Sequence, residues 1–205
     1  MSLNFIPSFE FEKQAKGPVV GLDEAGMGCW AGDVFAAAAY VPQTLSKDFL
    51  NQIHDSKKLT AKKRQSLFQT YKEMGIQFFV AHASLQEIEQ LNIRGAALLA
   101  MERAYQGLGI EAELALVDGT MQPKLPCQVQ AVVKGDQRSY SIAAASIAVK
   151  VSRDQYMREL DVLHPDYGWA DNAGYGTKKH QQALDQIGIS PYHRRMYRPI
   201  LERLK

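Results

Sequence analysis

The chain has 205 residues, of which 46% are hydrophobic and 22% are charged, and its formal net charge is +2. This length fits one large domain or a domain with a small appendage, and the composition is typical of a globular protein with a core. No apolar run approaches the roughly 18 residues that span a bilayer, and no basic leader precedes an apolar stretch at the N-terminus. Cys29 and Cys127 lack zinc-ligand spacing. We therefore expect free thiols and a cytoplasmic protein without membrane association.

Hydrophobic periodicity and capping residues predict the elements in chain order. The predicted strands lie at 19–23, 34–41, 76–81, 114–117 and 129–133. The predicted helices run from the cap Thr60 to Met74, over 85–90, over 93–108 after the cap Asn92, over 141–163, from the cap Thr177 to Ile187, and after Pro191. Three strands come first and later strands alternate with helices, which predicts an α/β fold with a mixed sheet flanked by helices. A small C-terminal subdomain is expected after residue 168.

Four carboxylates stand where predicted strands end. Asp23 and Glu24 close the first strand, Asp118 follows Val117, and Asp136 follows Gly135. Convergent carboxylates repel one another unless a cation lies between them. A hard divalent ion such as Mg²⁺ prefers oxygen ligands and is usually shared with phosphate oxygens, so the pattern indicates phosphoryl chemistry.

An ordinary turn is the simpler explanation for any one of these acids taken alone, since Asp-Gly is also a turn signal. Asp23 and Glu24 are neighbours in a strand and therefore point to opposite faces. They can share a metal only if the chain turns there. The glycines Gly26 and Gly28 make such a turn possible.

Four further segments carry groups suited to an anion or a sugar. Lysines ahead of a helix N-terminus form an anion site, a ring between two glycines can stack on a sugar or base, and guanidinium groups bind phosphate. The candidates are Ser56, Lys57 and Lys58 in the first segment, Ser146 and Lys150 one helical turn apart, Tyr175 with Lys178, and His193 with Arg194 and Arg195. Capping turns, packing of small residues, a tyrosine that plugs its loop and a solvated helix face are the structural alternatives.

Taken in order, these segments resemble the ribonuclease HII family from about residue 21 to 199. The matching pieces are Gly-Leu-Asp-Glu-Ala-Gly at 21–26, Asp-Ser-Lys-Lys-Leu-Thr at 55–60, Val-Asp-Gly at 117–119, Lys-Gly-Asp at 134–136, Ala-Ala-Ala-Ser-Ile-Ala-Val-Lys at 143–150, Arg-Asp at 153–154, Gly-Tyr-Gly-Thr at 174–177 and His-Arg-Arg at 193–195. The resemblance implies a ribonuclease H-like catalytic domain at 1–168 and a helical substrate-binding subdomain at 169–205.

The resemblance also implies a reaction. RNA strands of RNA–DNA hybrids, and ribonucleotides embedded in duplex DNA, would be hydrolysed to 5′-phosphate and 3′-hydroxyl ends. Two divalent ions, Mg²⁺ or Mn²⁺, would be held by the family's four acidic positions, here Asp23, Glu24, Asp118 and Asp136. The segment Gly26-Met27-Gly28 matches the backbone that reads the 2′-hydroxyl, and Tyr175 matches the tyrosine that recognises the adjacent deoxyribose.

One position departs from the family pattern. Met27 stands where the family usually has arginine, so a bidentate phosphate donor is missing. A hybrid-binding protein with weakened catalysis is therefore the first alternative, and a metal-dependent phosphatase or nucleotide hydrolase is the second. We expect a monomer, and a sliding-clamp partner is possible but cannot be read from the sequence.

Overall fold

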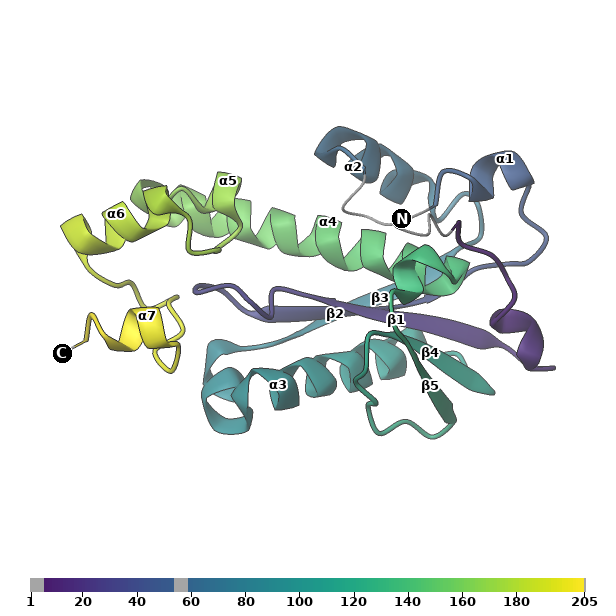
Figure 1. Cartoon of the computed structure of the whole chain (residues 1–205). Coiled ribbons are helices and arrows are strands. Elements are labelled where there is room, and N and C mark those ends of the chain that lie inside the picture. The colour runs from purple at the N-terminus through teal and green to yellow at the C-terminus, as the bar shows by residue number, and fades with distance from the viewer. Residues whose placement is uncertain (1–5, 54–58, 205) are drawn as a thin grey trace, which may run out of the picture.

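The structure is a computed structural model that describes residues 6–53 and 59–204. Its centre is a five-stranded sheet in the order β3-β2-β1-β4-β5 (Figure 1). The strands are β1 (Val19–Ala25), β2 (Val34–Tyr40), β3 (Gln77–Ala83), β4 (Leu114–Asp118) and β5 (Gln128–Val132). The first three pair antiparallel, whereas β1–β4 and β4–β5 pair parallel. The predicted mixed sheet and its five strands are confirmed.

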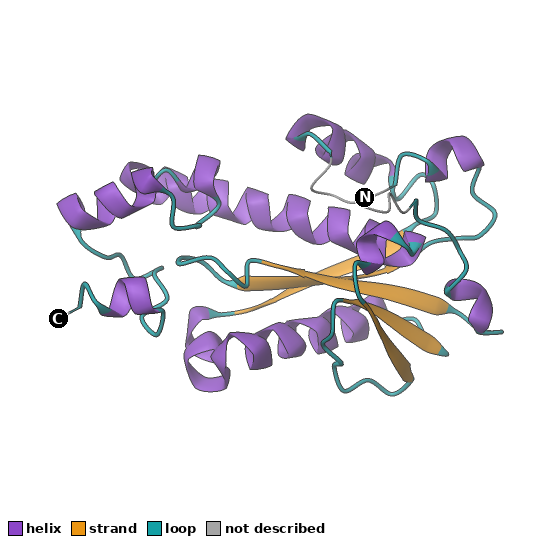
Figure 2. Ribbon diagram, viewed as in Figure 1, coloured by secondary structure: helices purple, strands orange, loops and turns teal. Residues whose placement is uncertain are grey.

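Helices cover both faces of the sheet, with α3 on one side and α4 on the other (Figure 2). The helices are α1 (Lys47–Leu50), α2 (Ala61–Thr70), α3 (Leu85–Leu108), α4 (Tyr140–Leu163), α5 (Trp169–Asn172), α6 (Lys178–Ile187) and α7 (Arg198–Leu201), with 3-10 turns η1 (Glu12–Gln14), η3 (Gly135–Gln137) and η4 (Pro165–Tyr167). In the described part of the chain, none of these helices has both the length and the apolar character needed to cross a membrane.

Local capping signals set several helix ends as the sequence predicts. Thr60 and Thr177 accept hydrogen bonds from the amides of Lys63 and His180. Asn92 lies at φ 57° inside α3, and its side chain accepts from the amides three and two residues on, at 3.2 and 3.0 Å. The two helices predicted on either side of Asn92 are therefore joined at a kink. The helix predicted directly after Pro191 is wrong in position, because 191–197 form turns and α7 begins at Arg198.

The C-terminal helices pack on the far end of α4 through a separate apolar cluster. Trp169, Leu184 and Ile200 join Met157 of α4 and Ala31, which follows β1. The segment after residue 168 thus lies against the loop that leaves the strand carrying Asp23. This contact places the C-terminal residues beside the carboxyl end of β1.

Close packing of α4 on β1 depends on small side chains. A Cβ atom added at Gly21 would lie 2.1 Å from the carbonyl carbon of Ser141 and 2.2 Å from the amide of Ile142. Both obstacles are backbone atoms, so rotation of a side chain cannot relieve them. Gly21 therefore fixes how near the helix comes to the strand.

Gly21→Ala should lower the free energy of unfolding by about 3 kcal/mol or more, because α4 must move off the sheet. The melting temperature of a chain of this size falls by roughly 2–4 °C per kcal/mol. Gly28→Ala is the matched control, since its Cβ would meet only Tyr175 at 3.6 Å. Equal melting temperatures for the two variants would contradict this role for Gly21.

Candidate active site

The carboxyl ends of the parallel strands β1 and β4 meet at one edge of the sheet. Leu22 pairs with Val117, so Asp23 and Asp118 leave neighbouring strands one residue further along. Side chains alternate between faces, and both acids project from the face that carries α4. They therefore lie on one side of the sheet, at its edge, as the sequence predicts.

Asp23 is almost completely buried, with 7% of its surface exposed. Burial raises the pKa of its carboxyl well above the ordinary value, and the nearby charges of Glu24 and Asp118 raise that pKa further. Hydrogen bonds from the Glu24 amide, at 2.8 Å, and from the Ser146 hydroxyl act in the opposite direction. The predicted approach of Ser146 to the acids is thus present, as a partner of Asp23.

Glu24 projects toward the other face, because β1 runs straight through to Ala25 and pairs with β2 there. The turn that would put both neighbouring acids on one face does not occur between them. Glu24 instead lines two adjoining hollows, one with Asp23 and one with Asp118. The first has a volume of about 360 Å³, and Met27 also lines both.

A hydrogen bond ties Asp118 to the turn that carries Asp136. The Gly135 amide donates to Asp118 Oδ1 at 2.6 Å, after Lys134 has taken a left-handed conformation at φ 56°. Asp136 is the middle residue of the 3-10 turn η3 (Gly135–Gln137) and is 5% exposed. The structure thus places Asp136 beside the end of β4.

The carboxylate oxygens of the four acids are the kind of ligand atom that a hard divalent ion prefers. Within residues 6–53 and 59–204, no three His, Cys, Asp or Glu side chains are already arranged to hold a metal. Mg²⁺ is usually bound by only one or two carboxylates together with water and substrate phosphates. An all-oxygen set of acids with a raised pKa at Asp23 suits such an ion, because a cation offsets the mutual repulsion.

Two buried arginines hold the loop from Gly26 to Asp33. Arg153 donates to the carbonyls of Asp33, Ala173 and Ala31 at 2.9–3.3 Å. Arg194 donates to the carbonyls of Gly32, Met27 and Asp33 at 2.9–3.2 Å. The loop backbone beside the acids is therefore held in place by hydrogen bonds from two buried guanidinium groups.

This arrangement corrects the expectation that His193 and Arg194 offer groups to phosphate. Each is 2% exposed, and their polar atoms are engaged inside the protein, because the C-terminal segment folds inward onto the loop after β1. Sequence reasoning gave Arg153 no role in the site. Helical periodicity could have indicated it, since Arg153 lies on the same face of α4 as Ser146 and Lys150, and all three residues line the cleft.

The remaining candidates lie at the rim or outside the described residues. Tyr175 is 47% exposed and lines the cleft together with Gly26 and Gly28. Lys150 also lines the cleft, and its ammonium group pairs with Asp154 at 2.6 Å. Lys178 and Arg195 are exposed. The predicted anion-binding residues Ser56, Lys57 and Lys58 lie outside the described residues.

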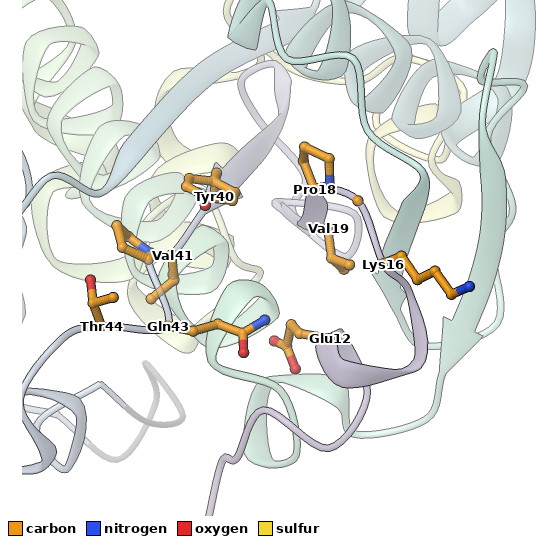
Figure 3. Close-up of a pocket in the computed structure, with 10 residues that line it drawn as sticks. Glu12, Lys16, Pro18, Val19, Tyr40, Val41, Gln43 and Thr44 are labelled. Carbon is orange, nitrogen blue, oxygen red and sulfur yellow. The ribbon is translucent and has the colours of Figure 1, made fainter.

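Another hollow lies at the opposite end of the β1–β2 pair (Figure 3). Its buried acid, Glu12, accepts hydrogen bonds from the Ser139 hydroxyl at 2.6 Å and the Ser141 amide at 3.1 Å. Glu12 therefore acts at the N-terminus of α4, where a negative charge is favoured. These contacts give it a structural role away from the acid cluster.

Comparisons with known proteins identify the family of this chain. The family model described as ribonuclease HII matches residues 20–201. The chain belongs to the ribonuclease HII family. It is 46% identical over 198 residues to ribonuclease HII of Paramagnetospirillum magneticum, covering 96% of this chain and 98% of that protein.

Solved structures show the same fold. The ribonuclease H2 of Pyrococcus horikoshii superposes with a TM-score of 0.76 at 23% identity, covering 90% of this chain and 95% of that one. Bst-RNase HIII in complex with Mn²⁺ gives a TM-score of 0.70 at 17% identity, covering 91% and 69%. The predicted ribonuclease H-like fold and the family resemblance are confirmed.

Asp23→Asn should stabilise the protein when divalent metal is removed. The folded-state pKa of Asp23 lies above its unfolded value, so the stability of the wild type falls as the pH rises from the unfolded pKa through the folded pKa. The variant lacks this decrease. Denaturant unfolding with a chelator from about pH 5 to 8 measures the difference. If the unfolding free energies of the two proteins changed with pH in the same way, Asp23 would not have a raised pKa in the folded protein.

Adding Mg²⁺ should reverse the order of stability. A ligand that binds only the folded state at 100 times its Kd stabilises by about 2.7 kcal/mol, and Asn at this position weakens that binding. The melting temperature of the wild type should therefore rise with Mg²⁺ more than that of Asp23→Asn. Equal rises would show that Asp23 does not hold the ion.

Proposed function

We propose that this protein is a divalent-metal-dependent endoribonuclease acting on the RNA strand of RNA–DNA hybrids and on ribonucleotides embedded in duplex DNA. The products are 5′-phosphate and 3′-hydroxyl ends. The observation that carries the proposal is the placement of Asp23 and Asp118 at the ends of adjacent parallel strands, beside a loop of fixed backbone and an exposed tyrosine. Membership of the ribonuclease HII family supports this reading of the cleft.

Asp23, Glu24, Asp118 and Asp136 are the proposed catalytic and metal-binding residues. Two divalent ions bound there would activate the attacking water and stabilise the leaving oxygen. The protein's own contribution is to hold the carboxylates still: Ser146 binds Asp23, and the Gly135 amide binds Asp118. Prearranged oxygen ligands need no reorganisation when the scissile phosphate arrives.

The loop Gly26-Met27-Gly28 supports recognition of the 2′-hydroxyl by its backbone. Gly26 has φ 96°, and a Cβ there would lie 2.0 Å from Arg153 Nε. The Met27 carbonyl accepts from Arg194 at 3.1 Å and from the Tyr197 hydroxyl at 2.5 Å. A backbone held this firmly can distinguish ribose from deoxyribose by one hydroxyl group.

The remaining substrate contacts follow from exposure and charge. Tyr175 is placed to stack on a sugar or base, and Lys178 and Arg195 are exposed cations for the phosphate backbone. We propose that residues 169–205 form the substrate-binding part and 1–168 the catalytic part. Mn²⁺ or Mg²⁺ would serve, and the similar fold of Bst-RNase HIII holds Mn²⁺. Cytoplasmic location and a monomeric state stay predictions.

Asp118→Asn should lower cleavage of duplex DNA carrying one ribonucleotide by on the order of 10³-fold, because a charged metal ligand supplies several kcal/mol. Asparagine keeps an oxygen that can accept from the Gly135 amide, so the melting temperature should change little. The measurement is single-turnover cleavage with Mg²⁺ or Mn²⁺. Asp48→Asn, at an exposed acid in α1, is the control. Full activity of Asp118→Asn would show that Asp118 is not a required metal ligand, whereas a wild type that binds the duplex without cleaving it would favour the hybrid-binding alternative.

Met27→Arg should increase cleavage at a single ribonucleotide several-fold, since arginine adds a charge-assisted phosphate donor. The contacts that hold this residue use its carbonyl, so the loop itself should be unaffected. We would compare kcat/KM on duplexes with one, four and many ribonucleotides, using Met27→Gln as the uncharged control. The same change on all three substrates would argue against a specific phosphate contact.

A further inference from the structure

Two histidines are buried behind the segment that carries Tyr175. His180 of α6 and His193 are 0% and 2% exposed. Their Nε2 atoms lie 2.9 Å apart, and the indole of Trp169 donates to His180 Nε2 at 3.2 Å. On its other side, His180 Nδ1 lies 3.0 Å from the Tyr175 carbonyl oxygen.

Two N–H groups, the Ser190 amide and the Trp169 indole, can only donate, and they fix the direction of the hydrogen bonds that run through His193 and His180. The Ser190 amide donates to His193 Nδ1 at 2.9 Å, so a neutral His193 carries its proton on Nε2. The Trp169 indole and His193 both donate to His180 Nε2, which must accept. His180 therefore carries its proton on Nδ1 and donates it to the Tyr175 carbonyl.

Burial opposes a positive charge on either ring. Burial lowers the pKa of His180, and Arg203 lowers it further, against the hydrogen bond to Tyr175. Burial lowers the pKa of His193 to about 4, and a protonated His193 would also be repelled by any positive charge on His180 or His164. Tyr167 and Trp169 supply the aromatic walls around both rings.

Further contacts of this segment hold the backbone on both sides of Tyr175. The Trp30 amide donates to the Gly174 carbonyl at 2.7 Å, and the Gln181 side chain donates to the Gly176 carbonyl at 2.9 Å. A Cβ at Gly176 would lie 2.1 Å from the Trp30 ring. Three consecutive carbonyls are thus held while the Tyr175 ring stays 47% exposed at the cleft.

We propose that His180 and His193 are positioning residues that hold Tyr175, through one directed chain of hydrogen bonds, where its ring can stack on a sugar next to the cleaved phosphate. This inference rests on the proposed function. The histidines touch no substrate and act only through the Tyr175 backbone. Substrate positioning of this kind is sensitive, because a displacement of about 1 Å can cost 10²-fold in rate.

The test compares His180→Leu, which removes the side-chain donor to the Tyr175 carbonyl but keeps the Thr177 amide donor at 2.8 Å, with His180→Asn, which keeps an N–H group at the position of Nδ1. On duplex DNA with one ribonucleotide, kcat/KM should fall about tenfold or more in the leucine variant. In the asparagine variant, kcat/KM should recover most of the way to the wild-type value. His164→Leu is the matched control, because His164 packs on Trp169 and Tyr192 in the same aromatic cluster.

A double-mutant cycle separates positioning from general destabilisation. In a Tyr175→Ala background, His180→Leu should cost almost nothing more, because the ring that it positions is gone. Additive losses, or an equal loss in His164→Leu, would overturn the inference. If His180→Leu does not fold, His193→Gln and His193→Leu make the same comparison, since glutamine keeps a donor at the ε position.

The outcome for the wild type separates this inference from the proposed function. No cleavage of any ribonucleotide-containing duplex by the wild type would overturn both. Normal cleavage by the wild type together with unchanged kcat/KM in His180→Leu would overturn only the positioning role.

Discussion

The structure depends on holding two like charges, Asp23 and Asp118, beside each other at the edge of one sheet. Parallel pairing of β1 with β4 puts them there, and the close approach of α4 over Gly21 closes the space above them. Burial and repulsion oppose ionisation of Asp23. Such strain at an active site is offset by the packing of the rest of the domain, and it is relieved when a cation binds.

A second constraint is the rigidity of the loop that follows β1. The loop has little regular structure, yet Arg153 of α4 and Arg194 of the turns before α7 bind its carbonyls. A charged donor holds a backbone carbonyl more strongly than a neutral donor does.

The C-terminal segment joins these two features. It contributes Arg194 to the loop after β1, Tyr175 to the rim of the cleft, and the chain of hydrogen bonds that runs from Ser190 through His193 and His180 to Tyr175. Its apolar contact with Ala31 and Met157 fixes that geometry. The spatial relation between acids and tyrosine is therefore set by packing between segments far apart in the chain.

The sequence alone determined what depends on neighbouring residues. It predicted the strands by their apolar runs, the caps Thr60 and Asn92, and the four acids at strand ends, because these features follow from local backbone geometry. Only the tertiary structure decided that β1 continues without a turn through Glu24, so that Glu24 and Asp23 project to opposite faces, and that His193 and Arg194 point inward. It also decided that Arg153 supports the loop. A residue's type and spacing give its periodicity, whereas its exposure depends on which distant segment covers it.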